Sequence, residues 1–125
     1  MAEKKRIAVL VSGGGTNLQA LIDAEKRGEC GSGEIVLVIA SKPGVYALER
    51  AKNAGIEGRV IARKDYESIA DYSRALADAM VEEKIDLVVL AGFLTIIDEQ
   101  VYNAFPNRIL NVHTALIPSF CGKGY

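Results

Sequence analysis

The sequence has few cysteines, no excess of charge of either sign and no long hydrophobic run. Its two cysteines, Cys30 and Cys121, fit neither a disulfide framework nor a metal-binding motif, which predicts a reducing compartment. With 15 basic and 16 acidic residues the net charge is -1, so no basic surface for binding nucleic acid or an anionic membrane is expected. The longest apolar run, residues 35–40, is far shorter than the roughly 18 residues of a membrane span, and residues 7–11 are too few for a secretory signal. These absences predict a soluble cytoplasmic domain.

What the sequence does contain is a regular alternation of apolar runs and helical patterns over its 125 residues, which predicts one domain spanning residues 1–125. Strands are predicted at residues 7–11, 34–40, 58–62 and 86–91, and a fifth begins at 108–111. Helices are predicted from Thr16, in capping-box spacing with Gln19, to about residue 28, from Pro43 to about residue 55, and from Ile69 to about residue 84. The predicted fold class is α/β, an open, mostly parallel, Rossmann-like sheet with helices on both faces.

Ligands of such sheets bind beyond the carboxyl ends of the strands, where residues 12–17 form a Ser-Gly-Gly-Gly-Thr-Asn loop. Glycines let the backbone approach a ligand closely, and the helix start behind them favours an anion such as phosphate. The same glycines also suit a plain tight turn capped by Thr16. The loop is not a Walker A motif, and it fails the dinucleotide pattern because Leu18 replaces the third glycine and Ser41-Lys42 offers no acidic residue. The loop therefore favours a phosphate and disfavours NAD.

A second polar group is predicted at the same edge, where Asn111 and the only histidine, His113, follow an apolar pair of residues. Residues i and i+2 of an extended segment point to one face, so both side chains could reach one substrate atom. The amide could donate to a developing oxyanion while the imidazole passes a proton, although a buried structural histidine is the alternative. An orienting carboxylate is not assignable, because Asp86 starts its strand at the wrong end of the sheet. Asp98 and Glu99 lie at the right end, at an unknown distance.

The apolar segment 92–97 is expected beside this edge. It could fill the core under a short helix, or its backbone could bracket a flat heterocycle in an apolar slot. We interpret the nearby Cys121 as incidental, since no base is placed to activate it.

Four segments together resemble phosphoribosylglycinamide formyltransferase, the folate-dependent enzyme family of purine biosynthesis. They are Val-Ser-Gly-Gly-Gly-Thr-Asn-Leu-Gln-Ala at 11–20, Val-Val-Leu-Ala-Gly-Phe at 88–93, Asn-Val-His at 111–113 and Leu-Ile-Pro-Ser-Phe at 116–120. The resemblance implies transfer of a formyl group from 10-formyltetrahydrofolate, as cosubstrate, to the amino group of 5-phosphoribosylglycinamide, without a metal. It also implies that Gly15, Thr16 and Asn17 bind the substrate phosphate through backbone N–H groups.

For the folate the resemblance implies that the segment Leu94, Thr95, Ile96 and Ile97 brackets the pterin. It further implies that Asn111 contacts the folate and polarises the formyl oxygen, while His113 is the general acid. The chain departs from the family pattern at Thr114, where a proline is usual, and at Thr95 and Ile69, where arginines near the folate are usual. These departures leave the effect on folate binding open.

The family continues beyond the length of this chain and carries an essential aspartate there, so we expect an N-terminal portion, truncated at its C-terminal side. Such a portion is expected to bind substrate phosphate with little or no activity alone, and an exposed sheet edge would allow it to oligomerise. Neither nucleic acid nor membrane is expected as a partner. The alternatives are another formyl-group enzyme, either methionyl-tRNA formyltransferase or formyltetrahydrofolate hydrolase, and a non-catalytic module that binds a phosphate-bearing ligand.

Overall fold

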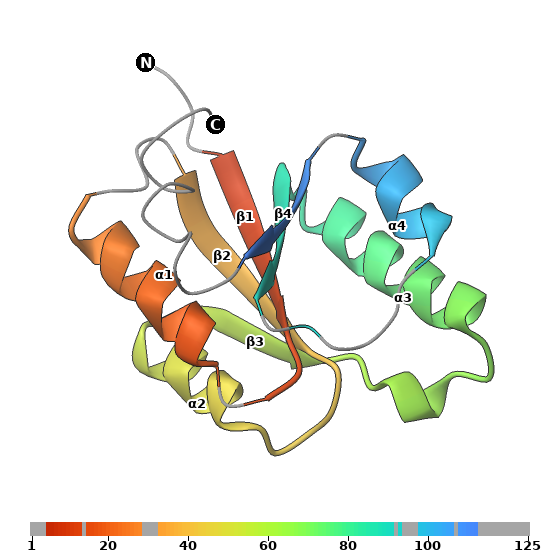
Figure 1. Cartoon of the computed structure of the whole chain (residues 1–125), viewed down its shortest axis with the longest axis horizontal. Coiled ribbons are helices and arrows are strands. Elements are labelled where there is room, and N and C mark those ends of the chain that lie inside the picture. Colours follow the sequence, from red (N-terminus) through yellow and green to blue (C-terminus); the bar gives the residue numbers. More distant parts are fainter. Residues whose placement is uncertain are drawn as a thin grey trace.

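The computed structural model describes residues 5–13, 15–28, 33–91, 93, 98–106 and 108–112, with only the backbone described at 16, 17, 111 and 112. Strands and helices alternate along the chain (Figure 1). The elements are β1 Lys5–Val11, α1 Thr16–Lys26, β2 Gly33–Ala40, α2 Tyr46–Asn53, β3 Glu57–Val60, the short 3-10 helix η1 Arg63–Asp65, α3 Ile69–Glu82, β4 Leu87–Ala91, α4 Glu99–Ala104 and β5 Ile109–Val112.

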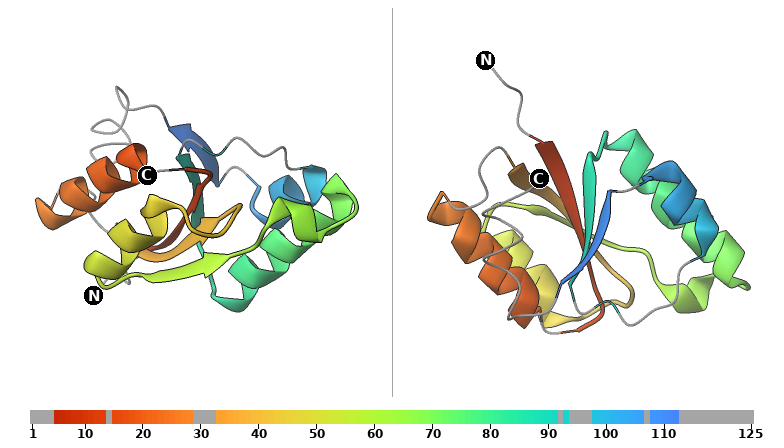
Figure 2. Two further views of the ribbon diagram at one scale, coloured as in Figure 1. Left: turned by 90° about the horizontal axis from the view of Figure 1, so that it is seen from below. Right: turned by 45° about the horizontal axis from the view of Figure 1, so that its top comes forward.

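The five described strands form one sheet in the order β3-β2-β1-β4-β5, and every neighbouring pair is parallel. Helices α1 and α2 cover one face of this sheet and α3 and α4 cover the other, as the two views of Figure 2 show. This arrangement confirms the predicted α/β class, and the described sheet is wholly parallel. Among the described residues, no helix is long and apolar enough to cross a membrane.

The core lies on both faces of the sheet because β1 is apolar from Ile7 to Val11 and its neighbour β4 is apolar throughout. In β1, Val9 and Val11 belong to the cluster under α1 and α2, while Ala8 and Leu10 belong to the cluster under α3 and α4. All four of these side chains are 0 % exposed. Side chains alternate between the faces of a strand, so a run without polar residues is buried only when both faces are covered. Each helix contributes its own apolar stripe, such as Leu18, Leu21 and Ile22 in α1.

One predicted helix cap and two predicted boundaries were wrong, each with a local reason. Helix α1 is capped by Gly15 in the left-handed conformation and not by Thr16, and Gln19 bonds to other side chains instead of closing a capping box. Helix α2 begins at Tyr46 and not at Pro43, because Gly44 has a φ of +74°, which no α-helix accommodates. Strand β3 comprises residues 57–60 and not 58–62; as an edge strand it is mostly polar, so it lacks a clear apolar pattern.

Helix α4 was not predicted. It has only six residues, of which Val101 is the buried one, so it is too short for a periodic stripe. Its start is nevertheless well defined. The Asp98 carboxylate accepts a hydrogen bond from the Gln100 N–H at 2.9 Å, and the Asp98 N–H donates to Ser73 Oγ of α3 at 2.9 Å.

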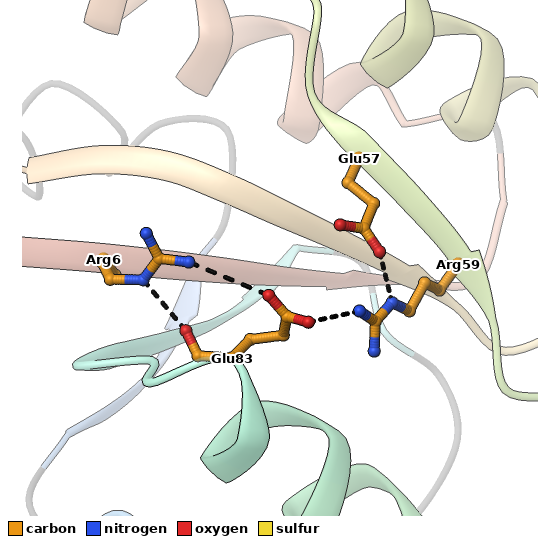
Figure 3. A network of polar contacts seen from close by, with 4 residues as sticks. All are labelled: Arg6, Glu57, Arg59 and Glu83. Atoms are coloured by element: carbon orange, nitrogen blue, oxygen red, sulfur yellow. Dashed lines mark hydrogen bonds and ion pairs between the residues drawn. The ribbon is translucent and has the colours of Figure 1, made fainter.

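An ion-pair network joins the C-terminal end of α3 to the sheet (Figure 3). The Glu83 carboxylate lies between the guanidinium groups of Arg6 in β1 and Arg59 in β3, and Arg59 also contacts Glu57. Arg6 Nε additionally donates to the main-chain carbonyl of Glu83 at 2.9 Å. Hydrogen bonds, first to Glu57 and then to Glu83, raise the pKa of the Arg59 guanidinium above its ordinary value, although partial burial opposes them. The Glu83 carboxylate is therefore shared by two guanidinium groups.

Candidate active site

The candidate site is at the carboxyl edge of the sheet, around the neighbouring strands β1 and β4. The connection after β1 runs to α1 on one face, and the connection after β4 runs to α4 on the other face. A parallel sheet binds its ligands at such a change of direction, because the two connections diverge there. The glycine loop follows β1 at this point, and β4 ends here at Ala91.

The glycine loop ends in a backbone conformation that glycine adopts most readily. Gly15 has φ 81° and ψ 33° and is the N-cap of α1, whose first bond runs from the Gln19 N–H to the Gly15 carbonyl at 2.8 Å. A Cβ at Gly15 would lie 2.8 Å from the Cβ and 3.0 Å from the Cα of Ala47 in α2. Glycine is thus required at this position both by the positive φ and by the close approach of α2.

The start of α1 has the features of an anion-binding helix terminus. Among the described side chains none forms a capping hydrogen bond, and the first turn contains no acidic residue. The first N–H groups of an α-helix lack acceptors within the helix, and the helix dipole adds partial positive charge there. The predicted phosphate-binding residues Thr16 and Asn17 lie in this first turn, directly after Gly15. Their backbone position suits the predicted role, and their side chains are outside the described part of the structure.

A pair of serines lies just before the glycine loop. Ser41, which follows β2, donates through its hydroxyl to Ser12 Oγ at 3.0 Å, and its N–H donates to the Val11 carbonyl at 3.0 Å. Each serine is only 7 % exposed. The Ser41 carbonyl in turn accepts from the Arg63 N–H at 3.1 Å. The ends of β1 and β2 and the start of η1 are therefore joined at the carboxyl edge.

The structure describes only part of the second predicted group, Asn111 and His113. In β5, Asn111 is paired with Leu90 and Val112 with Ala91, the last residue of β4. In the neighbouring pairing of β4, Leu90 lies beside Leu10 of β1. The backbone of Asn111 is thus level with the end of β1 at the carboxyl edge. The Asn111 side chain, His113, and the segment Leu94, Thr95, Ile96 and Ile97 lie outside the described residues.

Two carboxylates weighed as partners of a catalytic base, Asp98 and Asp86, each have a structural role in the described residues. Asp98 caps α4, and Asp86 accepts a hydrogen bond from the Arg6 N–H at 2.9 Å, at the amino end of the sheet as expected. Within the described ranges, no three His, Cys, Asp or Glu side chains gather in a way that could hold a metal ion. The described part of the site thus offers backbone donors and hydroxyl groups for binding.

Sequence reasoning missed the contribution of the segment between β2 and α2. In the sequence, Ser41 argues only against a dinucleotide, whereas in the structure it bonds to Ser12 at the glycine loop. Ala47 and Arg50 of α2 were not considered, although Ala47 is completely buried against Gly15. The position of Ser41 directly after an apolar strand was the available indication. Nothing in the local sequence of α2 indicates which loop it contacts.

The fold and the glycine loop define a parallel α/β protein with a candidate phosphate site, and comparison with known proteins identifies its family. Residues 5–124 match the family model described as formyl transferase, so the chain belongs to the formyl transferase family. It is similar to phosphoribosylglycinamide formyltransferase of Haemophilus influenzae, with 40 % identity over 118 residues that cover 94 % of this chain and 55 % of that protein. It is also similar to the trifunctional purine biosynthetic protein adenosine-3 of Homo sapiens, with 41 % identity covering 97 % of this chain and 12 % of that protein.

Solved structures show the same fold. Glycinamide ribonucleotide transformylase 1 of Symbiobacterium toebii superposes with a TM-score of 0.85 at 39 % identity, covering 90 % of this chain and 53 % of that chain. Phosphoribosylglycinamide formyltransferase of Bacillus halodurans superposes with a TM-score of 0.82 at 36 % identity, covering 87 % of this chain and 56 % of that chain. The chain therefore spans about half the length of the single-function relatives that it matches.

Proposed function

We propose that this chain is the N-terminal portion of a phosphoribosylglycinamide formyltransferase, which transfers a formyl group from 10-formyltetrahydrofolate to the amino group of 5-phosphoribosylglycinamide. The observation that carries this proposal is the glycine loop at the end of β1, in a chain about 40 % identical to enzymes named for that reaction. Matches to these enzymes cover nearly the whole chain. They do not favour methionyl-tRNA formyltransferase or formyltetrahydrofolate hydrolase.

Phosphate binding is the part of the proposal that the described geometry supports best. The N–H groups of Gly15, Thr16 and Asn17 would bind the phosphate of 5-phosphoribosylglycinamide, since they stand at an uncapped helix start without acidic neighbours in the first turn. Gly15 allows the phosphate to approach the backbone without meeting a side chain. This role fixes one end of the substrate, and the amino group at its other end is then directed along the sheet edge.

The chemical step would use the residues at the end of β5. The amino nitrogen attacks the formyl carbon of 10-formyltetrahydrofolate, and the formyl oxygen gains negative charge. Asn111 would donate to that oxygen, and His113 would supply the proton that the folate nitrogen gains when its bond to the formyl carbon breaks. The proton lost by the attacking amine balances the reaction, whose products are the formylated substrate and tetrahydrofolate. The segment 94–97, together with Asn111, would hold the pterin.

Calorimetry with this chain tests the binding half of the proposal. Titration with 5-phosphoribosylglycinamide is expected to give a heat of binding that fits one site per chain. Titration with a nicotinamide dinucleotide is expected to give no heat of binding. Binding of the dinucleotide alone would refute the assignment. A Lys26→Met variant, which changes an exposed cation in the last turn of α1, serves as the control and is expected to bind as the wild type does.

The catalytic half is tested by His113→Ala in an active protein that carries this chain. Turnover is expected to fall by roughly 100-fold or more, the usual contribution of a general acid, with little change in KM for either substrate. A large rise in KM at normal turnover would show that His113 is a binding residue. The product is measured by mass spectrometry of the formylated amine.

A further inference from the structure

One segment of the chain contacts both ends of the glycine loop. The Ser41 hydroxyl donates to Ser12 Oγ at 3.0 Å at the start of the loop, and both groups are nine-tenths buried or more. At the end of the loop, the Cβ position of Gly15 lies 2.8 Å from the Cβ of Ala47. Ser41 and Ala47 belong to the stretch of residues 41–50, which runs from the end of β2 into α2. The same stretch therefore restricts the positions of both ends of the loop.

Arg50 adds a third contact from this stretch, on the first turns of α1. Its Nη1 donates to Gln19 Oε1 at 3.2 Å, and Gln19 Nε2 donates to Asp23 Oδ1 at 3.0 Å. The Arg50 Cδ lies 3.4 Å from the Cβ position of Gly15, so its aliphatic part covers the helix start. Its guanidinium carbon is 4.8 Å from the centroid of the Tyr46 ring, which further restricts the arginine.

A loop with three successive glycines needs such contacts to keep one conformation. Glycine has more backbone freedom than any other residue, and the loop has no side chains of its own at these positions to restrict it. Ligand binding by backbone N–H groups requires those groups to point at one place, so a disordered loop would lose affinity through the entropy of ordering. Contacts from residues outside the loop remove that cost before the ligand arrives.

We propose that residues 41–50 hold the glycine loop in its phosphate-binding conformation, and that Ser41 and Arg50 are positioning residues for the substrate phosphate. The inference rests on the proposed function, because it takes the phosphate of 5-phosphoribosylglycinamide as the ligand of the loop. Neither residue touches the ligand. Ser41 acts through Ser12 at the start of the loop, and Arg50 acts through Gln19 in the first turns of α1.

Three variants of the chain test this inference by calorimetry with 5-phosphoribosylglycinamide, well below every unfolding midpoint. Ser41→Ala removes the buried hydroxyl and is expected to raise Kd roughly 10-fold, the factor that one net hydrogen bond of about 1.4 kcal/mol represents. Arg50→Met keeps the aliphatic part but removes the donor to Gln19, and is expected to raise Kd about 3-fold or more. The matched control Lys52→Met changes an exposed cation on the same helix and is expected to leave Kd unchanged.

Rescue separates positioning from simple stabilisation. Ser41→Thr retains the hydroxyl and is expected to restore a Kd within about 2-fold of the wild-type value, even where its unfolding midpoint stays lowered. Normal Kd in both Ser41→Ala and Arg50→Met, with only lowered midpoints, would overturn the inference and leave the proposed function standing. Arg50→Met provides this test on its own if Ser41→Ala does not fold. No binding by the wild-type chain would refute the proposed function and this inference together.

Discussion

Replacing Gly15 with alanine places a methyl group where Ala47 already lies. The new Cβ would be 2.8 Å from the Ala47 Cβ, closer than real Cβ contacts, and 3.0 Å from its Cα, tighter than most of them, and φ would remain at +81°. The left-handed conformation costs alanine about 1 kcal/mol or slightly more relative to glycine. Overpacking against α2 adds about 1–3 kcal/mol, because one of the two clashing atoms is backbone. The expected loss in the free energy of unfolding is therefore about 2–4 kcal/mol.

The chain offers a matched control at the other end of the same helix. Gly28 follows α1, has a φ of +77° and has no atom within 4 Å of its Cβ position. Gly28→Ala is thus expected to cost only the conformational part, about 1 kcal/mol. The difference between the two variants isolates the contact with α2. In the Gly15→Ala background, Ala47→Gly removes one of the two clashing atoms and is expected to recover part of the loss.

Unfolding in urea, followed by circular dichroism, measures these free energies, and thermal midpoints provide a second reading. At about 4 °C per kcal/mol for a chain of this size, Gly28→Ala is expected to lower the midpoint by about 4 °C and Gly15→Ala by about 8–16 °C. Equal losses for the two variants would refute the close packing of α2 against the loop. An absence of any recovery with Ala47→Gly would count against Ala47 as the residue responsible.

Three further variants test other parts of the fold. Tyr72→Phe removes a buried hydroxyl that has no hydrogen-bond partner among the described residues, and is expected to stabilise the protein by about 1 kcal/mol. Burial raises the pKa of Tyr72 to about 12, so the native state keeps a proton that the unfolded state loses near pH 10. Wild-type stability should then fall between about pH 10 and 12, and an equally steep fall in Tyr72→Phe would contradict the assignment. Glu83→Gln removes the anion between Arg6 and Arg59 and is expected to cost about 1 kcal/mol in urea titrations at low salt and less at 1 M salt; a salt-independent loss would exclude an electrostatic cause. Asp98→Ala is expected to speed amide exchange in α4 about 5-fold through loss of its N-cap, whereas Asp98→Asn, which keeps an acceptor oxygen, should exchange as the wild type does.

Much of the fold was predictable because its elements are locally encoded. The central strands contain long apolar runs, such as residues 7–11 and 35–40, and the spacing of Ile69, Tyr72, Leu76 and Met80 predicts α3 closely. The errors occurred where local patterns are weak or compete. Edge strand β3 carries few apolar residues, α4 is too short for periodicity, and a glycine with positive φ moved the start of α2 beyond Pro43.

The candidate site was predictable to a smaller degree. The glycine loop was recognisable because three successive glycines before a helical stripe have few uses, and the parallel topology assigned the loop to the ligand-binding edge. Asn111 was expected at the same edge, and its backbone is level with the end of β1. The roles of Asn111 and His113 stay predictions, as does that of residues 94–97. Ser41 and Arg50 were not recognised, because their partners are 29 and 31 residues away along the chain.

The sequence by itself determined the alternation of strands and helices, the burial of the sheet on both faces and the presence of a glycine loop after the first strand. These features depend on neighbours within a few residues, so periodicity and local backbone preferences reveal them. Only the tertiary structure decided which residues surround that loop. The pairing of β1 with β2 brings Ser41 against Ser12, and the packing of α2 beside α1 brings Ala47 against Gly15. Such contacts depend on strand order and register, which arise when the whole sheet assembles and which no short stretch of sequence specifies.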